Sequence, residues 1–422
     1  MNVPHSAGSA YEGLSIDLGK AAHTVTKALD YVGVDDRSHG RRVGLMCHRV
    51  AHNLGWDRPT RHFALLAGML HDCGVSSTAT HNKLVESMEW EGADDHCRRG
   101  AEFLRAFPPF AEYAATIRHH HTRWNSLPAS LDPRTSLFSN LVFLADRLDV
   151  VRGNFLTQRH QNEVLATRRE LVATLSPYVG ELFSPELFSA LEQAAKRDGF
   201  WLELEDEFLD QAIFETLATW DHSVHLRFDD IMALGEMISR IVDAKSPFTH
   251  YHSLRVADLA FHASGLLGFA PQRRQMLRLA ALLHDVGKLR TPDDILEKAG
   301  PLSPAEHDVM LRHPLDSKIV LTALFPNTPI ATWAAHHHEK LNGTGYPYGW
   351  SGEQIDLETR LLSICDIFQA LCQKRPYRDR LQVSDVVEIM ERMVKAGELD
   401  PPLFELLRTH AASLYAIAIR EG

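Results

Sequence analysis

The 422 residues are enough for two or three domains of ordinary size. Apolar residues make up 45% of the chain and charged residues 23%, which is usual for globular proteins and excludes a disordered, collagen-like or coiled-coil chain. The net charge of −11 argues against a groove for a nucleic-acid polymer. Because the chain has no apolar run of about 20 residues and its N-terminus does not resemble a signal peptide, we expect a cytoplasmic protein that does not bind membranes.

The spacing of apolar residues predicts helices. In chain order, the helices expected in the second half cover residues 231–241 (after the capping candidates Asp229 and Asp230), 273–285 (closed by Gly287), 304–312, 315–324, 357–372 and 402–418. Glycine and proline indicate loops near residues 292–301 and 341–352. Since no segment shows sustained alternation of apolar and polar residues, we predict an all-α fold, with a domain boundary near residues 220–228.

The chain contains an internal duplication. Two His-Asp doublets, His71-Asp72 and His284-Asp285, lie 213 residues apart, and other histidines and aspartates recur in the same order. The matched positions are His39 with His252, His71 with His284, Asp72 with Asp285, His96 with His313, His120 with His337, His121 with His338, and Asp146 with Asp366. Seven matches in one order indicate two tandem copies of one domain.

The seven residues of the second copy have the chemistry of a metal cluster. Adjacent residues on a helix point about 100° apart, so a His-Asp doublet serves two neighbouring ions more easily than one. Imidazole and carboxylate ligands without thiolate suit iron, manganese or zinc. Two such ions activate water and clamp a phosphoryl group, which indicates phosphate-ester hydrolysis. The alternative is that these histidines are buried helix residues satisfied by hydrogen bonds.

The C-terminal half resembles the HD-GYP subgroup of the HD phosphohydrolases over roughly residues 229–415. The resembling segments are HSLRVADLA, AALLHDVGKLRTPDDILEKAGPLSPAEHDVMLRHP, HHEKLNGTGYPYG and CDIFQALCQKRPYR. The resemblance implies two tandem HD-superfamily helical domains, at residues 1–225 and 226–422. It also implies metal-dependent hydrolysis of a cyclic dinucleotide, either cyclic di-GMP or 3′3′-cyclic GMP-AMP, to the linear dinucleotide.

The resemblance also implies roles for individual residues of the second copy. The metal ligands would be His252, His284, Asp285, His313, His337, His338 and Asp366. Asp285 would bridge two ions, iron or manganese, and Lys288 would neutralise a substrate phosphate. The residues of the substrate-binding loop would be Lys340, Gly343, Gly345, Tyr346 and Pro347, with Arg375 holding the second phosphate or a base edge.

The sequence departs from the family pattern at several positions. Lys340 and Asn342 replace an arginine and an aspartate of the loop that influences base preference. Phe248 stands where some members carry a glutamate that recruits a third metal, so we predict two metals in the second copy. These departures leave the choice between cyclic di-GMP and 3′3′-cyclic GMP-AMP open.

The first copy keeps the ligand pattern but loses other elements. Its metal-ligand candidates are Asp35, His39, His71, Asp72, His96, His120, His121 and Asp146. Val75 replaces the lysine, and the GYP loop is missing. We predict a regulatory or structural N-terminal domain that is able to hold a metal.

Two other functions stay open at this stage. The sequence also leaves open whether the protein forms a homodimer. One is a non-catalytic cyclic dinucleotide receptor, against which the intact ligand set and Lys288 argue. The other is an HD-type nucleotidase, which would lack the HP, HH and GYP elements that this chain carries.

Overall fold

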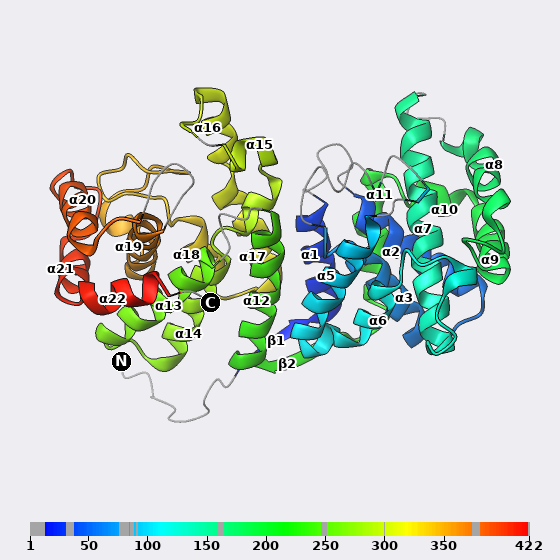
Figure 1. The fold of residues 1–422 in the computed structure, drawn as a ribbon, viewed down its shortest axis with the longest axis horizontal. Coiled ribbons are helices and arrows are strands. Elements are labelled where there is room, and N and C mark those ends of the chain that lie inside the picture. Colours follow the sequence, from blue (N-terminus) through cyan, green and yellow to red (C-terminus); the bar gives the residue numbers. More distant parts are fainter. Residues whose placement is uncertain are drawn as a thin grey trace, which may run out of the picture.

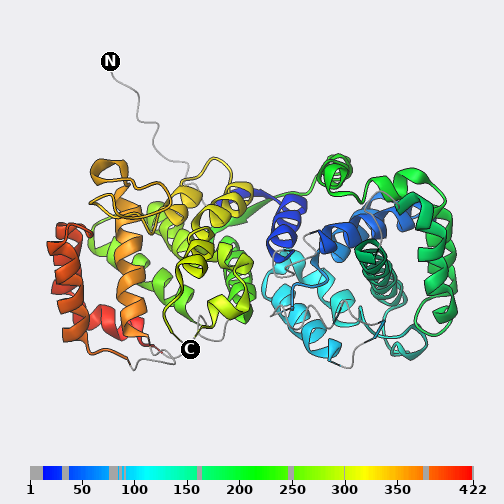
Figure 2. The same ribbon diagram turned by 90° about the horizontal axis from the view of Figure 1, so that it is seen from above.

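The computed structural model describes residues 13–30, 38–75, 84, 88–89, 92–158, 164–245, 251–298, 300–373 and 380–420. Across these ranges the regular elements are helices apart from two short strands, and the chain forms two lobes that lie side by side (Figure 1, Figure 2). The first half of the sequence forms one lobe and the second half the other. The predicted all-α fold class is confirmed.

The N-terminal lobe contains the elements from β1 to α11. They are β1 (Gly13–Asp17), α1 (Leu18–Leu29), α2 (His39–Asn53), α3 (Arg58–Leu70), α5 (Ala93–Ala106), η1 (Pro108–Tyr113), α6 (Ala114–Arg118), η2 (Trp124–Ser126), α7 (Pro133–Gln158), α8 (Val164–Leu175), η4 (Ser176–Tyr178), α9 (Pro185–Ala195), α10 (Asp198–Leu202) and α11 (Asp206–Leu217). The elements labelled η are short 3₁₀ helices.

The C-terminal lobe contains the elements from β2 to α22. They are β2 (Ser223–Arg227), α12 (Phe228–Lys245), α13 (His252–Leu266), α14 (Pro271–Leu283), η5 (Val286–Arg290), α15 (Asp293–Leu296), α16 (Pro304–Met310), α17 (His313–Leu324), α18 (Ile330–Ala335), η6 (Gly352–Gln354), α19 (Leu357–Cys372), α20 (Val383–Lys395), α21 (Pro401–Thr409) and α22 (Ala411–Ala418). None of the helices in the described ranges is long and apolar enough to span a membrane.

Some predicted element boundaries are wrong. The helix expected over residues 315–324 begins two residues earlier, at His313, because Pro314 is tolerated in the first turn, where its missing N–H has no helical partner. Asp229 and Asp230 lie inside the first turn of α12 and do not cap it. The helix expected over residues 402–418 is two helices that meet at His410.

The two short strands β1 and β2 are an exception to the predicted absence of a sheet. They pair antiparallel, with Ser15 opposite His225 at the centre. The strands begin 210 residues apart (223 − 13), and the two central residues are also 210 apart (225 − 15), so the midpoint of one strand faces the midpoint of the other. Each strand has only five residues and its partner lies in the other copy, so no hairpin signal is present in the sequence.

The helices that follow the two strands form the boundary between the lobes. Helix α1 packs against α17 and η5 of the C-terminal lobe, and α12 packs against α5 of the N-terminal lobe. Helices α17 and α5 carry the matched histidines His313 and His96. Each lobe therefore supplies one helix that contacts a histidine-bearing helix of the other lobe.

Gly287 and its counterpart Gly74 allow the two parts of each histidine cluster to approach closely. A Cβ atom on Gly287 would lie 2.1 Å from the carbonyl oxygen of His313 and 2.7 Å from the backbone nitrogen of Ser317. A Cβ atom on Gly74 would lie 2.0 Å from the carbonyl oxygen of His96. These glycines are therefore needed because a side chain at either position would collide with the facing backbone. Gly287 was expected to close the helix over residues 273–285, but α14 ends at Leu283 and Gly287 lies within η5.

We expect Gly287→Ala to destabilise the protein by at least about 1–3 kcal/mol, because backbone cannot move aside as a flexible side chain can. Gly199→Ala is the control, since its Cβ would meet nothing within 4 Å. Thermal unfolding of both variants measures the difference. Equal unfolding temperatures for the two variants would contradict this account of Gly287.

Candidate functional site

The seven predicted residues of the C-terminal lobe converge, although they come from five separate helical segments. Most of them lie at a helix end, where the side chain points past the helix into the space between neighbouring elements. His252 and His313 begin α13 and α17, His284 and Asp285 follow α14, His337 and His338 follow α18, and Asp366 lies within α19. Helix α14 is anchored by the buried residues Leu277, Leu279, Leu282 and Leu283, so the doublet that follows it is held against the core.

The Asp285 carboxylate lies between two groups of imidazoles. Its Oδ1 atom is 3.4 Å from His313 Nε2 and 3.9 Å from His337 Nε2. Its Oδ2 atom is 3.4 Å from His284 Nε2 and 3.8 Å from His252 Nε2. Each carboxylate oxygen thus faces a different pair of histidines, which is the arrangement that a carboxylate bridging two cations requires.

Three overlapping groups in this lobe could hold a metal ion. They are His252, His284 and Asp366; His284, Asp285 and His337; and His313, His337 and His338. In each group the candidate ligand atoms lie within 4.8 Å of one another. The groups share His284 and His337, so the cluster offers adjacent positions.

Hydrogen bonds to backbone carbonyls set the tautomers of three of these histidines. The Nδ1 atoms of His284, His313 and His337 donate to the carbonyl oxygens of residues 281, 310 and 334 at 2.7, 2.7 and 2.6 Å. A carbonyl oxygen only accepts, so Nδ1 carries the proton in the neutral ring and Nε2 keeps a free lone pair. These Nε2 atoms point into the cluster.

The same Nε2 atoms are buried and lack a hydrogen-bond partner, as does Asp285 Oδ1. Buried polar atoms are normally paired, because an unpaired one costs about 1–3 kcal/mol. The alternative that these histidines are satisfied core residues is therefore not supported. The donor set of imidazole nitrogens and carboxylate oxygens fits divalent metal ions of the first transition row.

The electrostatics of the cluster keep His313, His338 and Asp285 in the forms that bind metals, whereas at His284 burial is outweighed by Asp285 and Asp366, which raise the pKa of that ring. Burial lowers the pKa of His313 to about 3, with Lys288 adding to the effect, and burial lowers the pKa of His338 to about 4. Burial alone would raise the pKa of Asp285, but the charges of His284 and Lys288 hold it well below its usual value. Neutral imidazoles and ionised carboxylates are the metal-binding forms.

Lys288, the predicted phosphate-binding cation, and the predicted substrate-binding loop around Tyr346 lie at the edge of the cluster. Lys288 Nζ donates to Asp285 Oδ2 at 2.6 Å, and its side chain is 21% exposed. The Tyr346 ring stacks on the His338 ring, with centroids 4.7 Å apart. Gly345 allows this close approach, since a Cβ atom there would lie 2.4 Å from the backbone nitrogen of Lys340.

Some predicted residues lie elsewhere. Lys340 points to Glu398, with Nζ and Oε2 2.9 Å apart, so its charge is already paired. Gly343 has φ of +78°, a conformation that favours glycine, and its role is therefore at least conformational. Asp35, Phe248 and Arg375 lie outside the described residues.

Two residues that the sequence reasoning missed support the cluster. Gln369 Oε1 accepts a hydrogen bond from His252 Nδ1 at 2.5 Å, which orients this ring as the carbonyls orient the others. Glu339 accepts hydrogen bonds from the backbone N–H groups of Tyr348 and Trp350, which holds the loop closed on itself. The available signal for Gln369 was its position three residues after Asp366, on the same face of α19.

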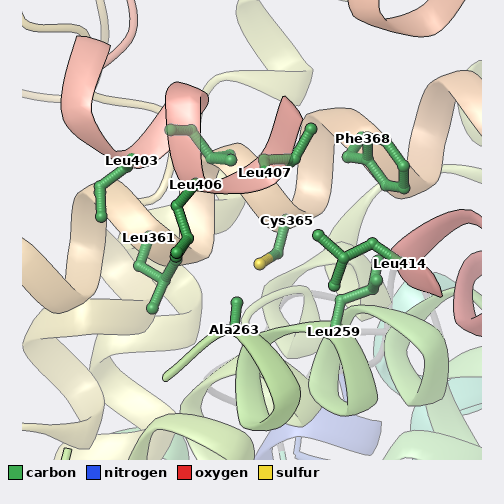
Figure 3. A pocket seen from close by; sticks show the side chains of 10 residues that line it. Leu259, Ala263, Leu361, Cys365, Phe368, Leu403, Leu406, Leu407 and Leu414 are labelled. Carbon is green, nitrogen blue, oxygen red and sulfur yellow. The ribbon is translucent and has the colours of Figure 1, made fainter. Parts of the chain in front are cut away.

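A pocket on the other side of α19 does not belong to the cluster. It is lined by Leu259, Ala263, Leu361, Ile364, Cys365, Phe368, Leu403, Leu406, Leu407 and Leu414 (Figure 3). Figure 3 shows these side chains, with the Cys365 sulfur among carbon atoms. The lining has no strong hydrogen-bond donor for a phosphate, so we interpret the pocket as a packing gap.

The N-terminal lobe brings its matched residues together in a similar way. Asp72 Oδ1 is 3.6 Å from His96 Nε2, and Asp72 Oδ2 is 3.2 Å from His71 Nε2. His39 Nε2 is 3.3 Å from Asp146 Oδ1. The groups that could hold a metal are Asp72, His96, His120 and His121, and His39, His71 and Asp72.

Comparisons with known proteins agree with the duplicated architecture. Residues 37–151 and 236–403 each match the family described as HD domain. A protein of Vibrio cholerae named 3′3′-cGAMP-specific phosphodiesterase 1 is 34% identical over 97% of this chain and 95% of its own length. The cyclic di-GMP phosphodiesterase PA4108 of Pseudomonas aeruginosa is 32% identical over 40% of this chain and 41% of its own. A crystal structure described as a cyclic GMP-AMP specific phosphodiesterase of V. cholerae superposes with a TM-score of 0.65 at 26% identity, and covers 95% of this chain and 99% of that one.

The fold and the paired clusters define a tandem HD-domain protein. The chain belongs to the HD-GYP family of the HD superfamily, with a diverged first copy, and the resemblance drawn from its motifs is confirmed.

The lowered histidine pKa values predict an acid-sensitive metal-free protein. In the unfolded chain His313 and His338 bind protons below pH about 6.5, whereas in the folded protein they stay neutral down to much lower pH, so stability is lost as pH falls through 6.5. We expect each to contribute up to about 1.4 kcal/mol per pH unit. Thermal unfolding of chelator-treated protein between pH 7.5 and 5.5 measures this slope. It should become shallower in the double variant His313→Gln, His338→Gln but not in the control His307→Gln, and an unchanged slope in the double variant would contradict the prediction.

Proposed function

We propose that the C-terminal lobe hydrolyses a cyclic dinucleotide to the linear dinucleotide, using two divalent metal ions, iron or manganese. The observation that carries the proposal is the set of buried, unpaired Nε2 atoms of His284, His313 and His337 around a carboxylate that faces both sides of the cluster. When bound, two divalent ions supply a water of lowered pKa and neutralise phosphoryl charge.

In this proposal all seven residues of the cluster are metal ligands, and Asp285 is shared. Asp285 has one oxygen toward each pair of histidines, which suits a shared ligand. Asp366 Oδ1 is 3.2 Å from His252 Nε2 and 3.7 Å from His284 Nε2, which suits a terminal ligand of one position. His313, His337 and His338 serve the other position.

Lys288 and the loop bind the substrate. The Lys288 ammonium is partly exposed beside Asp285, so it can turn to a substrate phosphate when Asp285 serves as a metal ligand. Tyr346, held on His338 at the cluster edge, offers an aromatic surface for a base, and Gly343, Gly345 and Pro347 shape the same loop. The roles assigned to Lys340 and Arg375 remain predictions from the motif.

The first candidate substrate is 3′3′-cyclic GMP-AMP. The relatives that match nearly the whole chain, and therefore both lobes, are named for that molecule or for cyclic GMP-AMP. The relative named for cyclic di-GMP matches only 40% of the chain. We therefore rank cyclic di-GMP second.

Product analysis separates the enzyme from a non-catalytic receptor and from a nucleotidase. Purified protein, loaded anaerobically with Fe(II) or Mn(II), is incubated with 3′3′-cyclic GMP-AMP, with cyclic di-GMP and with deoxynucleoside triphosphates. We expect linear dinucleotide from 3′3′-cyclic GMP-AMP. Binding without turnover in metal-replete protein would favour the receptor, and turnover of the triphosphates alone would favour the nucleotidase.

A matched pair of variants tests the division of labour between the lobes. Asp285→Asn removes the shared ligand, and we expect at least about a 10³-fold loss of turnover. Asp72→Asn changes the equivalent residue of the other lobe, and we expect a far smaller effect. Equal losses in the two variants would show that turnover does not belong to the C-terminal lobe.

Lys288 is tested separately. Because it is the cation that faces the substrate phosphate, Lys288→Met should lower kcat about 10²- to 10³-fold while metal content stays unchanged. Lys395→Met, an exposed lysine paired with Glu391, is the control. Undiminished turnover in Lys288→Met would remove Lys288 from the mechanism.

A further inference from the structure

The two lobes place a positive charge on different carboxylates. In the C-terminal lobe, Lys288 contacts Asp285, the carboxylate between the two groups of histidines. The matched position in the N-terminal lobe is Val75. There the cation is Arg147, which contacts the other carboxylate, Asp146.

Arg147 is fixed in place. Its guanidinium donates to Asp146 Oδ1 at 3.0 Å and to Asp146 Oδ2 at 2.8 Å. A further donor bonds the carbonyl oxygen of Leu84 at 2.8 Å, and the side chain is 3% exposed. Lys288, by contrast, is 21% exposed and makes a single contact of this kind.

This contact uses an oxygen of Asp146 that a metal ion would need at the position matching His252, His284 and Asp366 of the other lobe. Asp146 Oδ1 lies 3.3 Å from His39 Nε2 and already accepts from Arg147. In the C-terminal lobe the matching residue of the pair is Ile367, which has no charge, and no lysine or arginine among the described residues pairs with Asp366. Accordingly Asp366 belongs to a metal-binding group, whereas Asp146 belongs to none found in the described part of the chain. Without Asp146, the group at this position is His39, His71 and Asp72, and its only carboxylate, Asp72, also belongs to the neighbouring group of the same lobe.

The other position of the N-terminal cluster, which matches the His313 side of the C-terminal cluster, keeps four candidate ligands. It is formed by Asp72, His96, His120 and His121, whose ligand atoms lie within 4.8 Å of one another. His120 Nδ1 donates to the carbonyl oxygen of Ile117 at 2.6 Å, so the lone pair of the neutral ring lies on Nε2. This Nε2 is 3.2 Å from His96 Nε2, so the two rings share a hydrogen bond at the point where a metal ion would replace it. Asp72 Oδ1 is buried without a hydrogen-bond partner. Four nitrogen and oxygen ligands satisfy one divalent ion.

We propose that the N-terminal lobe binds one divalent transition-metal ion, through Asp72, His96, His120 and His121, and that the Arg147 guanidinium excludes a second. Since in-line hydrolysis at a paired site needs two adjacent ions, this lobe holds a single-ion site that does not perform that chemistry. The inference concerns the N-terminal lobe alone and does not depend on the activity of the other.

Metal counting in the full chain tests this proposal. The substitutions His284→Ala and His337→Ala together remove a ligand from each of the three C-terminal groups, so the metal that remains belongs to the N-terminal lobe. This background protein is loaded anaerobically with Mn(II) and, in parallel, with Zn(II), desalted and analysed for metal content. We expect about one ion per chain, and an electron paramagnetic resonance spectrum of isolated Mn(II).

Substitution of Arg147 then decides its role. In the same background, Arg147→Ile, which copies Ile367, should raise the content to about two ions and give a magnetically coupled Mn(II) pair. Arg147→Lys keeps the charge and should leave the content at one. His120→Ala should lower it to near zero. Arg147→Met repeats the test with a longer apolar side chain, and circular dichroism verifies that each variant is folded.

Three results would overturn the proposal. They are a background protein without metal, a background protein with two ions, and a content that stays at one in both folded apolar variants. The background count decides the first two without any change at Arg147. Turnover by the C-terminal lobe enters none of these readouts, so failure here is distinct from failure of the proposed phosphodiesterase activity.

Discussion

The metal clusters depend on one hydrogen bond that recurs, from a histidine Nδ1 to the carbonyl oxygen three residues before it. In the C-terminal lobe this bond holds His284, His313 and His337, and in the N-terminal lobe it holds His71 and His120. It can form because each histidine lies at a helix end or in a turn, where backbone carbonyls lack helical partners. The bond sets both the tautomer and the ring direction, so the ligand geometry is a property of the backbone.

The helix ends in turn must be brought together, and this requirement explains the glycines of the two His-Asp motifs. Gly287 and Gly74 lie against the backbones of His313 and His96, at distances that leave no room for a side chain. The segment η5, which follows α14, therefore touches the start of α17 at the backbone, and the turn after α3 touches the backbone of α5. Polar ligands can then converge within a core that is otherwise apolar.

Duplication has preserved this framework while the charges within it have changed. Both lobes retain a carboxylate between two sets of imidazoles, and in both a cation contacts one carboxylate of the cluster. In one lobe the cation is a partly exposed lysine on the central carboxylate, and in the other it is a buried arginine on the outer one. Each lobe also packs a helix against the other, since α1 contacts α17 and α12 contacts α5. In each lobe, a helix that carries a histidine of the cluster thus directly contacts a helix of the other lobe.

The sequence by itself determined the helical class, the tandem duplication and the family, because helix periodicity and motif spacing are local properties that repetition makes conspicuous. It also indicated the candidate ligands by residue type. Only the tertiary structure decided that Asp285 faces both histidine groups, that Gln369 orients His252, and that Arg147 contacts Asp146. These contacts join segments far apart in the chain or depend on the direction of one side chain, as does the pairing of β1 with β2 across 210 residues (223 − 13). Spacing along a chain carries no information about such directions, which are set by how the helices pack.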